Sequence, residues 1–80
     1  MSDVAQYLAC IISGIVEEPE EVDIEEITGH ISIILKLTVG KNDVGRIYGK
    51  RGNTLKALQT ILKSLGAKIG KHIQLEITNP

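Results

Sequence analysis

Two glycines that enclose two adjacent cations, Gly49-Lys50-Arg51-Gly52, most narrowly constrain how this chain can fold. They separate a short apolar segment at 44–48 from a long stretch in which leucine and isoleucine recur at helical spacing. Glycine allows a sharp backbone turn and the close approach of another group, because it has no Cβ. The pattern therefore predicts two helices joined by a tight turn, with Lys50 and Arg51 at its tip.

This turn has the chemistry of an anion-binding site. The helix that starts at Asn53-Thr54 directs the positive end of its dipole toward the two cations, an arrangement that suits a phosphate group. The simpler alternative is an ordinary connection between helices, in which Lys50 and Arg51 are solvated turn residues. A nucleoside-triphosphate loop is excluded, because no G-x-x-x-x-G-K-[ST] motif occurs.

Hydrophobic periodicity predicts the other elements within one domain, residues 1–80. The expected order is a helix from about 4 to 16–18, strands at 21–27 and 31–39, a helix at 44–48, a helix from 53 that ends near Gly66, and a strand at 73–78. Ser2 or Asp3 can cap the first helix, and Asn42 or Asp43 the short one. Residues 67–70 are expected to form a connector.

The charge is strongly segregated along the chain. Residues 1–35 contain eight acidic residues and no lysine or arginine, whereas residues 36–80 contain nine basic and two acidic residues. The net charge of −1 therefore combines −8 in the first part with +7 in the second. This distribution favours a polyanionic partner for the second part, although segregated charges also occur on ordinary solvated surfaces.

The remaining residues give no sign of catalysis or of a cofactor. Cys10 is the single cysteine, which fits an intracellular, cytoplasmic protein, and it is expected to be a buried, inert thiol. His30 and His72 are isolated, so no metal site is expected. Asp43 and Arg46 are interpreted as a helix cap and a local ion pair. Neither a signal peptide nor a membrane span is expected.

The run from Asp43 to Thr54 resembles the signature of the KH family, an apolar pair followed by G-x-x-G and an amphipathic helix. The element order is similar to that of the type II KH fold, and the whole chain is similar to the small bacterial KH proteins called KhpA. The resemblance implies an α+β fold in order α-β-β-α-α-β, with a three-stranded sheet and helices packed on one face. Tyr48 stands where that family usually has Ile, Val or Leu.

The resemblance also implies a function. It points to a non-catalytic protein that binds single-stranded RNA, acting as a post-transcriptional regulator or RNA chaperone. The backbone of the RNA would lie on the 49–52 loop, the bases in a groove beside it, and the strand at 31–39 would supply polar edges. The residues expected to contact RNA are Gly49, Lys50, Arg51, Gly52, Asn53, Thr54, Val44, Gly45, Arg46, Ile47, Tyr48, Lys56 and Lys41.

The resemblance further implies self-association, or pairing with a larger KH-containing protein (KhpB, also called Jag). The alternative function is therefore a protein-interaction module that uses the KH fold mainly for dimerisation or docking. Its working surface would be the acidic first half and the apolar helix at 4–16. Lys50 and Arg51 within the glycine loop favour RNA, because a docking domain has no need for cations there.

Overall fold

The computed structural model describes residues 3–78. Its helices are α1 (Asp3–Ser13), α2 (Val44–Tyr48) and α3 (Asn53–Ile69), and its strands are β1 (Asp23–Thr28), β2 (Ser32–Thr38) and β3 (His72–Thr78). Short 3₁₀ turns occur at Pro19–Glu21, Lys41–Asp43 and Lys50–Gly52. The predicted order α-β-β-α-α-β is confirmed. Ser2, a candidate cap of the first helix, lies outside the described residues.

The three strands form one mixed sheet in the order β1-β2-β3. β1 pairs antiparallel with β2, so that Ile24 lies opposite Leu37, and β2 pairs parallel with β3, so that Leu35 lies beside Leu75. Parallel pairing of β2 and β3 requires a crossover, which α2 and α3 supply. The loop between these two helices is therefore part of the connection between two adjacent strands.

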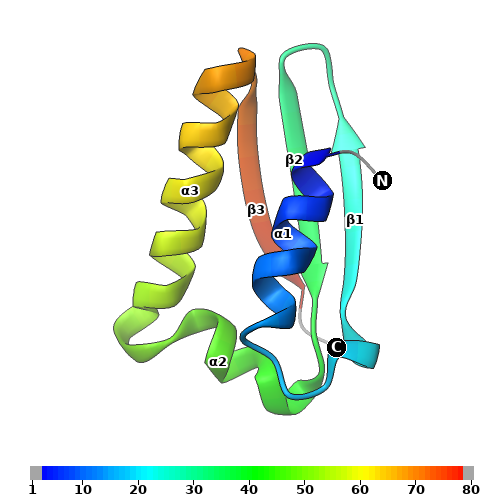
Figure 1. Ribbon diagram of the computed structural model, residues 1–80, viewed down its shortest axis with the longest axis vertical. Coiled ribbons are helices and arrows are strands. Elements are labelled where there is room, and N and C mark those ends of the chain that lie inside the picture. Colours follow the sequence, from blue (N-terminus) through cyan, green and yellow to red (C-terminus); the bar gives the residue numbers. More distant parts are fainter. Residues whose placement is uncertain (1–2, 79–80) are drawn as a thin grey trace.

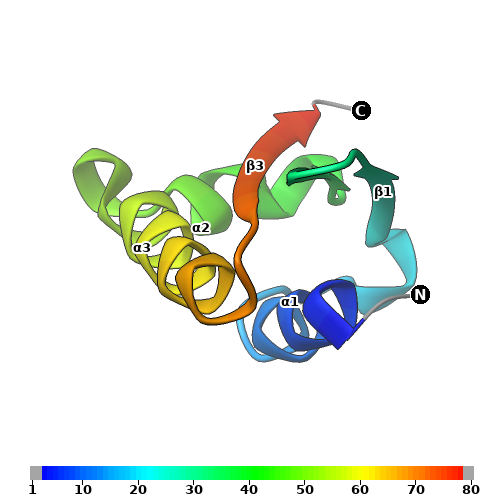
Figure 2. The same cartoon turned by 90° about the horizontal axis from the view of Figure 1, so that it is seen from above.

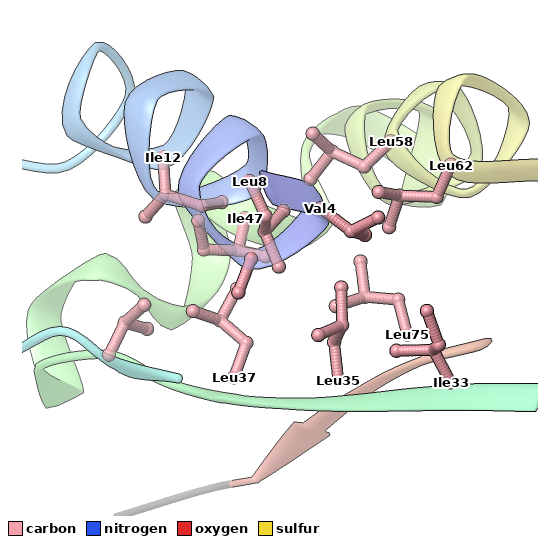
Figure 3. Packing of buried hydrophobic residues seen from close by; sticks show 12 residues of the cluster. Val4, Leu8, Ile12, Ile33, Leu35, Leu37, Ile47, Leu58, Leu62 and Leu75 are labelled. Atoms are coloured by element: carbon pink, nitrogen blue, oxygen red, sulfur yellow. The ribbon is translucent and has the colours of Figure 1, made fainter. Parts of the chain in front are cut away.

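The helices cover one face of the sheet, as expected for this α+β class (Figures 1 and 2). Alternate residues of β2 point into the core, which explains the period-two pattern of its sequence. They meet apolar side chains from both long helices, as Figure 3 shows. The buried cluster contains Val4, Ala5, Leu8, Ile12, Ile33, Leu35, Leu37, Val39, Ile47, Leu58, Leu62 and Leu75.

Two helix ends differ from the sequence prediction. α1 ends at Ser13, earlier than 16–18, and the chain then turns with the amide of Val16 donating to the carbonyl of Ile12 at 3.1 Å. α3 continues to Ile69, so residues 67–69 belong to the helix instead of a connector. The glycine that ends α3 is Gly70, whose left-handed backbone (φ 73°) closes the helix.

Gly66 has a packing role inside α3. It is buried, and a Cβ built there would collide with the carbonyl of Lys71 and lie 3.2 Å from the side chain of Ile73. The same residue accepts a hydrogen bond from the amide of Lys71 at 2.9 Å. Gly66 thus permits the close approach of α3 and the start of β3, and its presence does not mark the end of the helix.

Cys10 also differs from expectation, because it is exposed on α1 and not buried. It lies on the side of the helix that faces away from the sheet, next to Tyr7 and Gln6.

Candidate nucleic-acid interface

Gly49 sets the geometry of the loop. It ends α2, with its amide donating to the carbonyl of Gly45 at 2.9 Å, and its backbone adopts φ 70° and ψ −178°. This region of conformational space is essentially restricted to glycine. A Cβ at this position would also collide with the side chain of Thr54 and lie 2.9 Å from its amide nitrogen. Thr54 therefore contributes to the site by packing closely against the turn.

The next residues bend the chain into α3 through two successive left-handed conformations. Arg51 has φ 57° and ψ 26°, and Gly52 has φ 74° and ψ 13°. Arg51 is the one residue other than glycine with a positive φ among those described, a conformation that costs an ordinary side chain about 1–2 kcal/mol. The space around Gly52 is open. The left-handed backbone conformation alone therefore explains why position 52 is a glycine.

Part of the loop's hydrogen-bonding capacity is used internally. The amide of Gly52 donates to the carbonyl of Gly49 at 3.2 Å, and the amide of Asn53 donates to the carbonyl of Lys50. These amides are not available to a phosphate. The side chains of Lys50 and Arg51 are exposed at the tip, as are those of Asn53 and Lys56 at the start of α3. The loop thus presents the side-chain cations of Lys50 and Arg51 to an anion at its exposed tip.

α2 presents some of the expected groove residues and buries another. Ile47 is completely buried in the core, so its assignment to the RNA surface is wrong; it anchors α2 to the sheet. Gly45 is exposed with open space around it, and Val44 is partly exposed. Tyr48 is 38% exposed next to Gly49. Its ring is thus accessible beside the loop.

Arg46 is held by acidic residues. Its guanidinium lies 2.6 Å from a carboxylate oxygen of Glu17 and 3.5 Å from one of Asp43. Asp43 is completely buried and accepts hydrogen bonds from the amides of Glu17 and Glu18, each at 3.0 Å. The Asp43–Arg46 ion pair is as predicted, whereas the side chain of Asp43 makes no cap bond to α2. It fastens the chain that follows α1 to the start of α2.

The strand expected at 31–39 to supply polar edges has its main chain paired on both sides. β2 is the central strand, paired with β1 on one side and β3 on the other. Within residues 3–78, the open edge beside α3 belongs to β3. Lys41 is exposed just before α2, at the end of that helix opposite the loop.

The remaining surface offers little else for chemistry in the part of the chain that the structure describes. There, no group of three or more His, Cys, Asp and Glu residues is arranged to hold a metal ion. The helices between residues 3 and 78 include none with the length and apolar character needed to cross a membrane.

Comparison with known proteins agrees with this geometry. The profile of the family described as KhpA/KhpB, KH domain, matches residues 5–77. The chain belongs to this family. It is 43% identical to the RNA-binding protein KhpA of Chlamydia trachomatis over 72 residues, which cover 90% of this chain and 92% of the relative. It is 46% identical to the RNA-binding protein KhpA of Chlamydia caviae, over 89% of this chain and 91% of the relative. It is 40% identical to the RNA-binding protein KhpA of Clostridium acetobutylicum, over 90% of this chain and 96% of the relative.

Two features of this KhpA/KhpB-family chain were not found from its sequence. One is the buried role of Asp43, although its position as an isolated acid among basic residues was a usable signal. The other is the open edge of β3, which depends on strand order. The structure brings the loop, α2 and the start of α3 together, and it places Lys41 and the paired Arg46 at the periphery of that surface.

Proposed function

We propose that this chain acts as a single KH domain, residues 1–80, that binds single-stranded RNA without catalysis, inside the cell. The 49–52 loop holds the sugar–phosphate backbone, with Lys50 and Arg51 as cationic ligands. The bases lie beside Gly45 and Tyr48 on α2 and the start of α3. Membership of the KhpA/KhpB family and the RNA-binding relatives support RNA as the ligand class.

The observation that carries the proposal is the loop itself. A glycine-only backbone at Gly49 and a left-handed Arg51 place two cations on an exposed tip at the start of α3. Phosphate contacts of this kind position a strand without reading its sequence. The chain has two tyrosines and no tryptophan or phenylalanine, so stacking contributes little. We therefore propose micromolar affinity and loose base preference, as suits a post-transcriptional regulator or RNA chaperone.

Binding of a labelled, mixed-sequence, single-stranded RNA tests the proposal. Wild type and the double variant Lys50→Asp/Arg51→Asp are compared at several salt concentrations, and circular dichroism checks that both are folded. Aspartate tolerates the left-handed conformation of position 51, so the variant should keep the loop. Wild type should bind with a negative salt slope and the variant should not. Equal binding by both would contradict the clamp.

A second function, protein docking, is favoured by one specific observation. An apolar groove lies between α1 and α3, where Tyr7 and Ile61 are 61% and 49% exposed and Ile11 and Leu65 line the floor. We propose that this surface supports a homodimer or pairing with a larger KH-containing protein of the KhpB type. A dimer would present two loops to one RNA and gain avidity.

Sedimentation of wild type and Tyr7→Glu tests whether this surface forms a dimer. Loss of a dimer in the variant supports this surface, and a monomeric wild type excludes the homodimer.

A further inference from the structure

Tyr48 places an aromatic ring directly before the glycine loop. The chain has two tyrosines and no tryptophan or phenylalanine, and the two rings lie at different sites. Tyr7 lines the groove between α1 and α3, whereas Tyr48 is the last residue of α2 and adjoins Gly49. Because Tyr48 is 38% exposed, a molecule held at the loop can reach its ring.

The surface around this ring is open. Among residues 3–78, the hydroxyl of Tyr48 makes no hydrogen bond, and its ring stacks on no other ring. Gly45 lies three residues earlier, which places it on the same face of α2. A Cβ built at Gly45 would have no side-chain atom within 4 Å. A ligand that covers the ring would therefore displace water and no contact within the described structure.

The neighbours of Tyr48 fix the direction of this face. Ile47 is completely buried and sets the rotation of α2 against the sheet. Arg46 lies two residues before Tyr48, on a different face of the helix, and its guanidinium is held 2.6 Å from a carboxylate oxygen of Glu17. The exposed surface of Gly45 and Tyr48, called the shelf below, is therefore uncharged. It lies next to the cationic loop.

We propose that the shelf holds one base and favours a purine there. The inference rests on the proposed function, because a phosphate held at 49–52 brings a neighbouring base beside Tyr48. Differences in stacking strength give sequence preference without hydrogen bonds to the base. The two fused rings of a purine cover more of the tyrosine than a pyrimidine does, and Gly45 leaves room for them. One ring limits this preference to one nucleotide, which leaves the other positions permissive.

Five tetranucleotides test the preference: UUUU and the four RNAs in which adenine replaces one uracil. A G-x-x-G loop clamps about four nucleotides, so the four substituted RNAs place adenine at each position in turn. Wild type should bind one of them at least about fivefold more tightly than UUUU, as measured by fluorescence anisotropy. A preference below fivefold at every position would overturn the proposal.

Two variants of Tyr48 separate stacking from a structural role. Tyr48→Leu keeps an apolar side chain but removes the flat ring, so it should lose the adenine preference. Its salt slope for UUUU should stay the same, because the phosphate contacts remain. Tyr48→Phe keeps the ring and should keep the preference. Circular dichroism checks that both variants are folded. Equal weakening of all five RNAs by Tyr48→Leu, or equal loss of preference in the two variants, would overturn the proposal.

Intrinsic fluorescence supplies a second measurement, because the chain has no tryptophan. Tyr48 is the single tyrosine in Tyr7→Phe, and Tyr7 is the single tyrosine in the matched control Tyr48→Phe. A stacked base quenches tyrosine emission. Saturation with the favoured RNA should therefore lower the emission of Tyr7→Phe and leave that of the control unchanged. If the ring of Tyr48 serves a protein contact instead, bound RNA leaves its emission unchanged, which would overturn the shelf.

Lys50→Asp/Arg51→Asp keeps the shelf and the loop clamp distinguishable. Loss of all five RNAs in this variant supports the clamp, whichever base the wild type favours. If wild type binds all five alike and the double variant binds none, the shelf fails and the clamp stands. If wild type binds none of the five, both fail.

Discussion

Glu17 and Arg46 are 29 residues apart in the chain, and their side chains meet at 2.6 Å. This pair connects the acidic first half of the protein to α2, the helix that precedes the cationic loop. Both side chains are about half exposed or more, so the pair contributes little to stability. Its main consequence is electrostatic, because Glu17 neutralises a cation next to the proposed RNA surface.

Glu17→Gln should therefore raise RNA affinity slightly. We expect about a twofold gain at low salt that disappears at high salt, because one charge in water contributes a few tenths of a kcal/mol at ordinary phosphate distances. The free energy of unfolding should change by less than about 1 kcal/mol. Fluorescence anisotropy at two ionic strengths measures the effect. Glu20→Gln, an exposed acid in the neighbouring turn, controls for net charge, and an equal gain there would contradict a specific role for Glu17.

Asp43 should be one of the most sensitive positions for stability. Its buried carboxylate accepts the amides of Glu17 and Glu18, and Asp43→Ala leaves two partly buried donors without an acceptor. We expect a loss of about 3 kcal/mol in the free energy of unfolding, measured by urea denaturation. Asp43→Asn keeps one acceptor oxygen and should lose less.

Asp23→Ala is the matched control for Asp43, because Asp23 is exposed on β1. Its free energy of unfolding should stay within about 0.5 kcal/mol of wild type. Similar losses for the alanine variants of the two residues would show that the hydrogen bonds of Asp43 do not stabilise the fold.

The two loop glycines should respond differently to alanine. Gly49→Ala meets both a glycine-only backbone and the side chain of Thr54, so we expect a loss of more than about 2 kcal/mol and a distorted loop. Gly52→Ala meets open space, so the cost is the left-handed conformation alone, about 1 kcal/mol. Thermal and urea unfolding give the comparison. Equal costs at the two positions would contradict the packing of Thr54 against the turn.

Two helical glycines should respond to alanine with opposite signs. Helix propensity alone favours alanine at both by about 0.5–1 kcal/mol. Gly45 has open space around it, so Gly45→Ala should stabilise the fold by about this amount. Gly66 approaches the carbonyl of Lys71, so Gly66→Ala should destabilise it by about 1–3 kcal/mol. Stabilisation of both variants in urea unfolding would show that α3 and β3 can move apart without cost.

Local sequence signals predicted much of this fold. The bounds of α2 follow from the glycines after it and the polar residues before it, and the strands follow from alternating apolar residues. The sequence predictions that failed did so because of contacts between elements that are distant in the sequence. Gly66 looks like a helix end in the sequence, but it is retained for contact with residues 71 and 73. Ile47 is buried and β2 central because of how the helices and strands assemble, and the partners of Asp43 lie 25 and 26 residues away. A local sequence pattern does not predict such long-range contacts.

The central claim is that RNA binds at the glycine loop. An NMR titration of the ¹⁵N-labelled chain with mixed-sequence, single-stranded RNA tests it most directly, because it locates the contact residue by residue. The account predicts that the largest shifts occur at Gly49–Lys56 and at the exposed side of α2, with little change along residues 17–26. Shifts concentrated on Tyr7, Ile11 and Ile61 between α1 and α3, with an unperturbed loop, would contradict it.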